Sequence, residues 1–289
     1  MYFVYTLTDP RTGTVAYVGI TNNAYERFKQ HISYRDNNGK KHAWIQQLQQ
    51  EKVMPAMKIL EVVENEEIAL DRERYWIKHY KEQGIQLTNL YLPPMRKVEP
   101  QRHEISGVSS NSVFSLSTPN DLWAEFTIGQ SLYGEESIVP YKRLLEWREA
   151  NSAMFMSLKE GGKVVAYSSL MPIREDVILS LLKSRLQERD IPPDAVRQWT
   201  EPRLSVYVAH VAIKPSGSLP KDRNLEQLVI EHTIEWMFSL DKQYEITNWY
   251  GIGTTAEAQH LFESLGFTEI ASSHDSDRKE YLLAHLKEL

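Results

Sequence analysis

The stretch "AYVGITNNAYERFKQHI", residues 16–32, decides the organisation of the N-terminal part of this chain. It opens with aromatic and β-branched residues typical of a strand, and the two asparagines that follow are typical helix N-caps. We therefore expect a strand that runs directly into a helix. On that helix Arg27 and His31 are four residues apart, so their side chains share one face.

The residues on either side extend this pattern. "YFVYTL" is a second strand-like run, and "TDPRTGT" supplies Asp-Pro and Gly for a hairpin turn between the two strands. The helix should continue to about Tyr34. Further on we predict a helix at "KKHAWIQQLQQE", a strand at "AMKILEVV" and a long helix at "NEEIALDRERYWIKHYKEQG", with Asn65 as N-cap and Gly84 just beyond its end. "IQLTNLYL" would add one short element.

Length and composition limit the classes of protein. A chain of 289 residues favours two domains, and no apolar run approaches the length of a membrane span. The absence of cysteine excludes a disulfide scaffold, a cysteine nucleophile and cysteine-ligated zinc. The start of the sequence lacks the pattern of a secretory signal, so we expect a cytoplasmic protein without a membrane partner.

The charge is distributed unevenly along the chain. Residues 1–97 hold 14 Lys and Arg against 11 Asp and Glu, a net charge of +3, whereas the remaining residues hold 19 against 28, a net charge of −9. Between the halves, residues 91–112 are rich in Pro and Ser and show no sustained period, as in a linker. We predict a first domain at 1–92, a linker at 93–117 and a second domain at 118–289.

The second domain reads as a mixed α/β unit around one central sheet. One or two helices should occupy residues 121–151, a hairpin 153–173, a helix 176–189 and a strand 204–215. An amphipathic helix from Leu225, a strand at 244–253, a helix at 255–266 and a closing strand at 279–286 should follow.

Glu73 is the most informative carboxylate of the first domain. It shares one helical stripe with Ala69, Trp76 and Tyr80, and an ionised carboxylate among aromatic side chains is costly to bury without a partner. One interpretation is an ion pair with Arg72 or Arg74, or simple exposure at the edge of the stripe. The other is a metal ligand, because Mg²⁺ needs only one or two protein carboxylates beside water and phosphate.

These residues together resemble the GIY-YIG endonuclease family over about residues 1–92. Tyr5 in "FVY" matches the tyrosine of the first triplet, although Phe3 and Val4 replace Gly and Ile, and Tyr17-Val-Gly19 matches the second triplet. Arg27 follows Tyr17 by ten residues, as the essential arginine of the family does, and the further matches are His31, Glu73 and Asn89. Without the resemblance, Arg27 and His31 could be a solvated pair, and Tyr5 and Tyr17 ordinary cross-strand neighbours.

The resemblance implies hydrolysis of DNA phosphodiester bonds with Mg²⁺ or Mn²⁺. Tyr5 or Tyr17, helped by His31, would take a proton from water, which requires a lowered phenol pKa. Arg27 would clamp the phosphate and Glu73 would hold the metal. Four lysines are candidate contacts to the DNA backbone: Lys29, Lys40, Lys41 and Lys58. Double-strand cleavage by a protein with one site would require a homodimer or two successive nicks.

The second domain resembles the fold of Gcn5-related (GNAT) N-acetyltransferases over about residues 118–289, most clearly at "SLGF" with Gly266 and Phe267. The family holds CoA on a glycine-rich loop at a helix N-terminus. Here the loop is "PSGSLPKDRNLEQ", with Gly217 as its one glycine and with Lys221 and Arg223 as cations that could compensate. Phe262 stands where many members have a tyrosine acid, and the remaining polar candidates are His210, Glu226 and Tyr250.

Two functions from different classes follow from this sequence. The first is a metal-dependent DNA endonuclease whose GNAT-like domain is accessory and binds a substrate, a protein partner or CoA. The alternative is an acetyl-CoA-dependent N-acyltransferase that the first domain docks on nucleic acid. A third interpretation, binding without catalysis in either domain, is opposed by the complete N-terminal set of residues.

Overall fold

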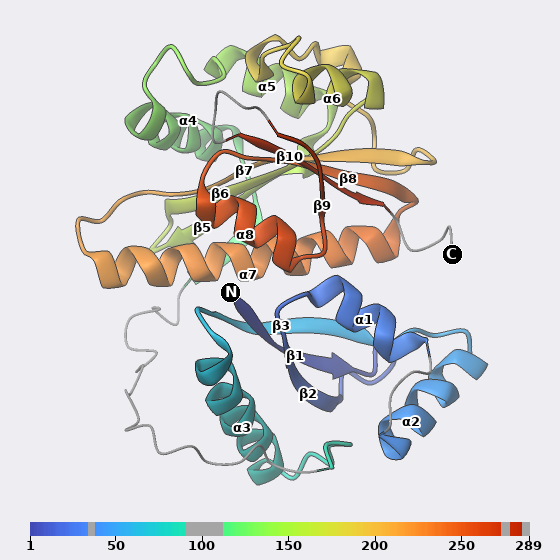
Figure 1. The fold of residues 1–289 in the computed structure, drawn as a ribbon. Coiled ribbons are helices and arrows are strands. Elements are labelled where there is room, and N and C mark those ends of the chain that lie inside the picture. The colour runs from blue at the N-terminus through green and yellow to red at the C-terminus, as the bar shows by residue number, and fades with distance from the viewer. Residues whose placement is uncertain (34–37, 91–111, 273–277, 285–289) are drawn as a thin grey trace. The chain divides into compact units, whose positions relative to one another are not determined.

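A computed structural model describes residues 1–33, 38–90, 112–272 and 278–284. The chain is an α/β protein that divides into two compact units, one of residues 1–102 with 257–267 and one of residues 103–256 with 268–289. The first unit contains a three-stranded sheet and the second a seven-stranded sheet, in agreement with the fold class predicted from the sequence (Figure 1). Among the described residues, none of the helices combines the length and apolar character that a membrane crossing needs.

The first unit has the element order predicted from the sequence. Its elements are β1 (Tyr2–Thr8), β2 (Val15–Thr21), α1 (Ala24–Ile32), α2 (Gly39–Gln50), β3 (Ala56–Val63) and α3 (Glu66–Glu82). The strands pair antiparallel in the order β2-β1-β3, so β1 is central and β2 is an edge. The short element expected at 85–92 is absent from its described part, because residues 85–90 form neither helix nor strand.

Local sequence explains where these elements begin and end. Asn23 and Asn65 cap α1 and α3, each accepting a hydrogen bond from the backbone N–H three residues on. Gly84 follows α3 with a φ of 80°, a conformation that glycine adopts without the steric cost of a Cβ. The hairpin turn between β1 and β2 closes through Gly13, whose N–H donates to Asp9 O at 2.8 Å.

The small sheet packs against α3 on one face and carries Tyr5 and Tyr17 on the other. Val4 and Val18 pack against Ala69 and Ile77 of α3, and all four are fully buried. Because side chains alternate along a strand, the neighbouring Tyr5 and Tyr17 point to the other face, together with the buried Phe3 and Leu7. Helix α1 lies over this face (Figure 1), and its His31 packs against both tyrosine rings. We call this face, which carries both phenols, the polar face of the first unit.

The second unit is built on a mixed sheet with the strand order β4-β5-β6-β7-β8-β10-β9. Every neighbouring pair is antiparallel except β7 and β8, which run parallel. Its strands are β4 (Ser112–Leu116), β5 (Phe155–Glu160), β6 (Lys163–Pro172), β7 (Leu204–Ile213), β8 (Ile246–Gly253), β9 (Thr268–Ser272) and β10 (Lys279–Ala284). Its helices, with the last one shared with the first unit, are α4 (Pro119–Tyr133), α5 (Tyr141–Ala150), α6 (Glu175–Leu182), α7 (Leu219–Gln243) and α8 (Ala256–Ser264).

Three elements of this part differ from the sequence prediction. Residues 112–116, expected within the linker, form β4 and pair with β5, while residues 93–111 lie outside the described residues. The helix expected at 176–189 ends at Leu182, since Ser184 takes a φ of 52°. Helix α7 begins at Leu219 rather than Leu225, because Pro220 falls in the first helical turn, where its missing N–H costs nothing. β9 was not expected.

Candidate functional site

Tyr5 is the centre of the polar face of the first unit. It lies on the central strand β1, and its side chain is fully buried. Its hydroxyl oxygen lies 2.7 Å from Nε2 of His31 and accepts a hydrogen bond of 3.2 Å from Nε of Arg27. Arg27 and His31 are one helical turn apart on α1, so a single face of that helix contacts the tyrosine. The structure thus brings together three residues that are far apart in the sequence.

Gly19 allows the two tyrosines to approach each other. It lies opposite Tyr5 on the neighbouring strand. A Cβ at this position would lie 2.7 Å from the Tyr5 hydroxyl oxygen and 2.7 Å from Cε1 of Tyr17, closer than side chains tolerate. The glycine of the Tyr-Val-Gly triplet is therefore required by the close packing of the two rings.

Tyr17 lies at the edge strand β2 and is half-buried. Its ring centroid is 6.3 Å from that of Tyr5 and 5.4 Å from that of His31. The ammonium of Lys41, on α2, lies 4.1 Å from the Tyr17 ring centroid. The prediction that Lys41 is a surface contact to DNA is wrong, because this side chain is only 1% exposed. Of the other predicted lysines, Lys40 and Lys58 are exposed and Lys29 pairs with Glu26 at 3.4 Å.

The pKa of Tyr5 is raised, whereas the role of proton acceptor predicted from the sequence required a lowered phenol pKa. Burial raises the pKa of Tyr5, and the neighbouring Tyr17 raises it further, while Arg27 lowers it. The pKa of Arg27 is itself raised, because the phenols of Tyr5 and Tyr17 outweigh the opposing effect of burial. Arg27 therefore remains a cation, and Tyr5 remains neutral at physiological pH.

Glu73, on α3, is a half-buried carboxylate near this cluster. Burial raises its pKa to about 7, and the charge of Arg27 opposes that rise. Neither proposed ion pair forms within the described residues. Arg72 instead donates to Glu61 at 2.6 Å, as does Nε1 of Trp76 at 2.7 Å. Among the described side chains, Glu73 makes no hydrogen bond or ion pair.

The surroundings of Glu73 fit a hard cation held by few protein ligands. The described residues contain no group of three His, Asp or Glu that could enclose a metal ion by themselves. A carboxylate without a protein partner, beside a cation that can hold a phosphate, is the arrangement in which Mg²⁺ completes its coordination with water and phosphate oxygens. A metal at Glu73 would depend on its substrate for part of its coordination.

Asn89 holds the edge of the site together. Its side-chain oxygen accepts from Val18 N–H at 3.0 Å, and its side-chain nitrogen donates to Val18 O at 2.8 Å. Just before it, the N–H of Thr88 donates to Ala16 O at 2.7 Å. These bonds satisfy backbone groups on the free edge of β2, so Asn89 fixes the strand that carries Tyr17 and Gly19.

The loop before α7 differs from a free anion-binding cradle. Gly217 precedes the helix with a φ of 79°. The carboxylate of Asp222 accepts from Ser216 N–H at 2.8 Å, and its pKa is lowered by Ser216, by the charge of Lys221 and by the N–H of Gly217. The N–H groups of Ser216 and Gly217 thus already face a carboxylate of the chain.

The cations predicted for CoA binding lie in the first turns of α7. Lys221 lies 3.8 Å from Glu160, with about half of its side chain exposed, and Arg223 is also exposed. Phe262 is buried and packs against Phe267, with 5.0 Å between their ring centroids, so it belongs to a core.

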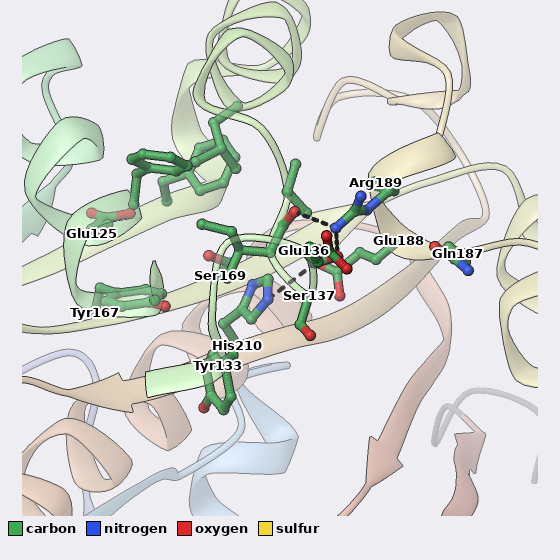
Figure 2. Close-up of a pocket in the computed structure, with 16 residues that line it drawn as sticks. Glu125, Tyr133, Glu136, Ser137, Tyr167, Ser169, Gln187, Glu188, Arg189 and His210 are labelled. Atoms are coloured by element: carbon green, nitrogen blue, oxygen red, sulfur yellow. Dashed lines mark hydrogen bonds and ion pairs between the residues drawn. The ribbon is translucent and has the colours of Figure 1, made fainter. Parts of the chain in front are cut away.

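The second unit contains a cavity of about 300 Å³ that the sequence did not indicate (Figure 2). Figure 2 shows His210 and Glu188 directed toward one another, with 3.2 Å between Nε2 and Oε1. Burial raises the pKa of Glu188, and His210 opposes that rise. Burial also raises the pKa of Glu125 to about 7. The lining residues come from separate segments, so no local motif could have revealed the cavity.

The three unassigned polar residues of the second unit lie in different surroundings. His210 lines the cavity, Tyr250 donates a hydrogen bond of 2.6 Å to Glu175, and Glu226 is exposed on α7. Glu175 is absent from the cavity lining. These contacts give the three residues no common site.

The first unit is a small α/β domain in which tyrosine, arginine and histidine side chains converge. Residues 1–86 match the model of the GIY-YIG catalytic domain, and this part of the chain is a GIY-YIG domain. No curated protein matches the chain.

The second part of the chain structurally matches GNAT acetyltransferases. It is similar to Ard1 from Thermoplasma volcanium, with 14% identity, a TM-score of 0.39 and coverage of 61% of this chain and 99% of that one. It is also similar to the ribosomal-protein-S18-alanine N-acetyltransferase from Escherichia coli, with 16% identity, a TM-score of 0.38 and coverage of 60% of this chain and 92% of that one. A third similar structure is the GNAT family N-acetyltransferase YhbS from Escherichia coli, solved in complex with CoA. It has 13% identity, a TM-score of 0.38 and coverage of 60% of this chain and 81% of that one. These likenesses concern the fold alone.

Proposed function

We propose that this protein is a metal-dependent DNA endonuclease whose site is the polar face of the GIY-YIG domain. The observation that carries the proposal is the convergence of Tyr5, Tyr17, Arg27 and His31 beside a carboxylate, Glu73, that has no partner among the described residues. Phosphodiester hydrolysis needs an activated water, a cation at the phosphate and a stabilised leaving oxygen. The cluster supplies a side chain for each of these needs.

The proton of the attacking water goes to Tyr17 in this mechanism. Tyr5 is fully buried and its hydroxyl is engaged by His31 and Arg27, so it orients these two residues. Tyr17 is half-buried beside the same residues, and its phenol is the one that a bound substrate can reach. His31, near both rings, is suited to pass the proton on.

Arg27 clamps the scissile phosphate in this mechanism. A preorganised cation at the phosphate gains strength as negative charge accumulates in the transition state. The two phenols beside Arg27 raise its pKa, which keeps it charged throughout. Glu73 would hold Mg²⁺ or Mn²⁺, and a metal bound there supplies positive charge for the departing oxygen.

The substrate class follows from the phosphodiester chemistry and from the exposed cations of the domain. Lys40 and Lys58 are exposed, and we propose them as contacts to the DNA backbone. Such contacts release counterions, so binding should weaken steeply with salt. We propose a cytoplasmic location and either a homodimer or successive nicking for cleavage of both strands.

Cleavage of defined DNAs tests this proposal. Flap, junction, single-stranded and duplex DNAs are incubated with the full chain, with and without Mg²⁺. Arg27→Ala and Glu73→Gln should each reduce metal-dependent cleavage at least about a thousandfold, because each removes charge from the transition state. Arg11→Ala and Glu67→Gln change exposed residues of the same types and should cleave like the wild type.

The folded state of each variant is checked by circular dichroism. Folded Arg27→Ala and Glu73→Gln proteins that both cleave at the wild-type rate would overturn the nuclease assignment. Cleavage that is equally fast in a chelator would overturn the role of the metal.

We assign no transferase step to the second unit, and propose that it is an accessory domain. Asp222 already binds backbone donors of the loop where an acyltransferase would hold CoA. Calorimetric titration of the full chain with acetyl-CoA tests this assignment. No heat and no shift of the melting temperature are expected. Saturable binding would show that the loop accepts CoA, and transfer of the acetyl group would restore the acyltransferase alternative.

A further inference from the structure

Lys41 is a lysine that is almost completely removed from solvent. It is 1% exposed, and its ammonium lies 4.1 Å from the centroid of the Tyr17 ring. Lysine is rarely buried to this extent, because removing an ammonium from water is costly. A cation over an aromatic face is attracted by the ring, and more strongly when both groups are desolvated. The position of this charge against a phenol of the proposed site indicates a role beyond packing.

A series of hydrogen bonds fixes Lys41 relative to Tyr17. Asn38 caps α2 and accepts from the backbone N–H of Lys41 at 3.2 Å. Its side-chain nitrogen donates to Thr88 O at 2.9 Å. The N–H and hydroxyl of Thr88 both donate to Ala16 O, at 2.7 and 2.8 Å. Because Ala16 immediately precedes Tyr17, the helix that carries the ammonium is tied to the strand that carries the phenol.

The two tyrosines of the site differ in the charges that face them. Tyr5 is fully buried and shares its hydroxyl with His31 and Arg27. Tyr17 is faced by Tyr5 from β1, by His31 and Arg27 from α1 and by Lys41 from α2. Positive charge close to a phenol favours its ionised form. Lys41 contacts the Tyr17 ring directly, and the Tyr17 hydroxyl shares Arg27 with Tyr5.

We propose that Lys41 is a positioning residue for the nuclease reaction: its buried ammonium holds the Tyr17 ring and favours the phenolate that takes a proton from water. The inference rests on the proposed function. As the proton moves to the Tyr17 oxygen, the water oxygen forms a bond to phosphorus. The bond from phosphorus to the leaving oxygen breaks, and its electron pair stays on that oxygen. A direct contact between Lys41 and a DNA phosphate is opposed by the burial of Lys41.

The pH dependence of cleavage tests the role of Lys41. Single-turnover rates are measured over a pH series at saturating Mg²⁺, on the DNA that the wild type cleaves fastest. Lys41→Met keeps the volume but not the charge. It should lower the rate at neutral pH about 10- to 100-fold, less than the roughly 100- to 10,000-fold that a positioned acid or base itself contributes, and move the ascending limb of the profile to higher pH. Lys41→Arg should restore most of the rate.

Lys40→Met is the matched control, since Lys40 is the exposed neighbour on the same helix. It should keep the wild-type pH profile and reduce the salt dependence of DNA binding, by about one in the slope of log K against log salt. Lys41→Met should keep the wild-type salt dependence. A Lys41→Met protein with the wild-type pH profile, or one altered only in KM and salt dependence, overturns the proposal.

Two further measurements separate this inference from the nuclease assignment. In a Tyr17→Phe background, Lys41→Met should have no additional effect on the rate, whereas additive losses would show that Lys41 acts independently of Tyr17. The ionisation of Tyr17 is read without DNA, as the ultraviolet difference between the wild type and Tyr17→Phe. Lys41→Met should move this ionisation to higher pH, and an unchanged titration overturns the proposal even if no DNA is cleaved. Lys41→Gln replaces Lys41→Met if the latter does not fold.

Discussion

The polar face of the GIY-YIG domain and the loop before α7 present charged groups in opposite ways. At the first, Glu73 has no partner among the described residues, and Arg27 contacts phenols rather than a carboxylate. At the second, Asp222 occupies the N–H group of Ser216. A site that binds substrate must keep some charged or hydrogen-bonding groups unpaired within the protein, whereas a structural contact pairs them. This difference separates a candidate nuclease site from a loop in which the Ser216 N–H is already bound within the chain.

The largest expected effect is that of Gly19→Ala, which tests how closely the N-terminal cluster is packed. The added Cβ would lie 2.7 Å from atoms of Tyr5 and Tyr17, and the fully buried Tyr5 has no room to move. We expect a loss of about 1–3 kcal/mol in the free energy of unfolding and loss of cleavage, because the rings must separate. Urea denaturation and the cleavage assay measure the two effects.

Gly39→Ala is the control for this variant. A Cβ at Gly39, in the first turn of α2, meets nothing within 4 Å, so stability should stay equal or rise slightly. Equal stability and activity for Gly19→Ala and Gly39→Ala would contradict the packing argument.

Glu125→Gln tests how a buried carboxylate with hydrogen-bond donors beside it behaves in the second unit. Glu125 is 3% exposed, and Ser117 and Ser157 donate hydrogen bonds to it at 2.5 and 2.7 Å. Burial raises its pKa to about 7, above its unfolded value. The folded state therefore binds the proton more tightly, and the stability contributed by Glu125 is present at low pH and lost as the pH rises through about 7.

The glutamine variant removes this titration. Relative to the wild type, its free energy of unfolding should rise by about 2–3 kcal/mol between pH 5 and pH 8. Urea denaturation at both pH values measures the change, with the exposed Glu135→Gln as control. The same pH dependence of the free energy of unfolding in the wild type and Glu125→Gln would contradict a raised pKa at Glu125.

Asn89→Ala tests whether the edge strand of the nuclease site depends on its tether. Removing the amide leaves the N–H and C=O of Val18 without these partners, which should cost about 1–3 kcal/mol. Cleavage should fall more than stability alone explains, because β2 carries Tyr17 and Gly19. Hydrogen exchange at Val18 should accelerate, and unchanged exchange there would argue against the tether.

Asp222→Asn should have the smallest effect. It tests the second member of the comparison, the loop before α7. Replacing the carboxylate weakens a charge-assisted bond to Ser216 at the protein surface, so the free energy of unfolding should change only slightly. If Asp222 is all that blocks the loop, the variant should gain measurable affinity for pyrophosphate by calorimetry. If it does not, the loop lacks the shape of a cradle altogether.

Local sequence signals predicted most of the fold. The asparagine caps, the hairpin turn and the alternating apolar residues act over a few neighbouring residues, so they can be recognised without tertiary structure. The prediction was wrong where long-range pairing decides the outcome, as for residues 112–116, which are a strand because β5 lies beside them. It also missed the cavity around Glu188 and His210, whose lining residues meet only after folding.

By itself, the sequence predicted a chain of two domains and proposed Tyr5, Tyr17, Arg27, His31 and Glu73 as site residues, because spacing along strands and helices fixes which side chains share a face. Only the tertiary structure decided what surrounds them. It buried Tyr5 and Lys41, left Tyr17 half-exposed and directed Asp222 to the α7 loop. Burial and charge neighbours arise from contacts between distant segments, and these contacts set the pKa and the accessibility of each group.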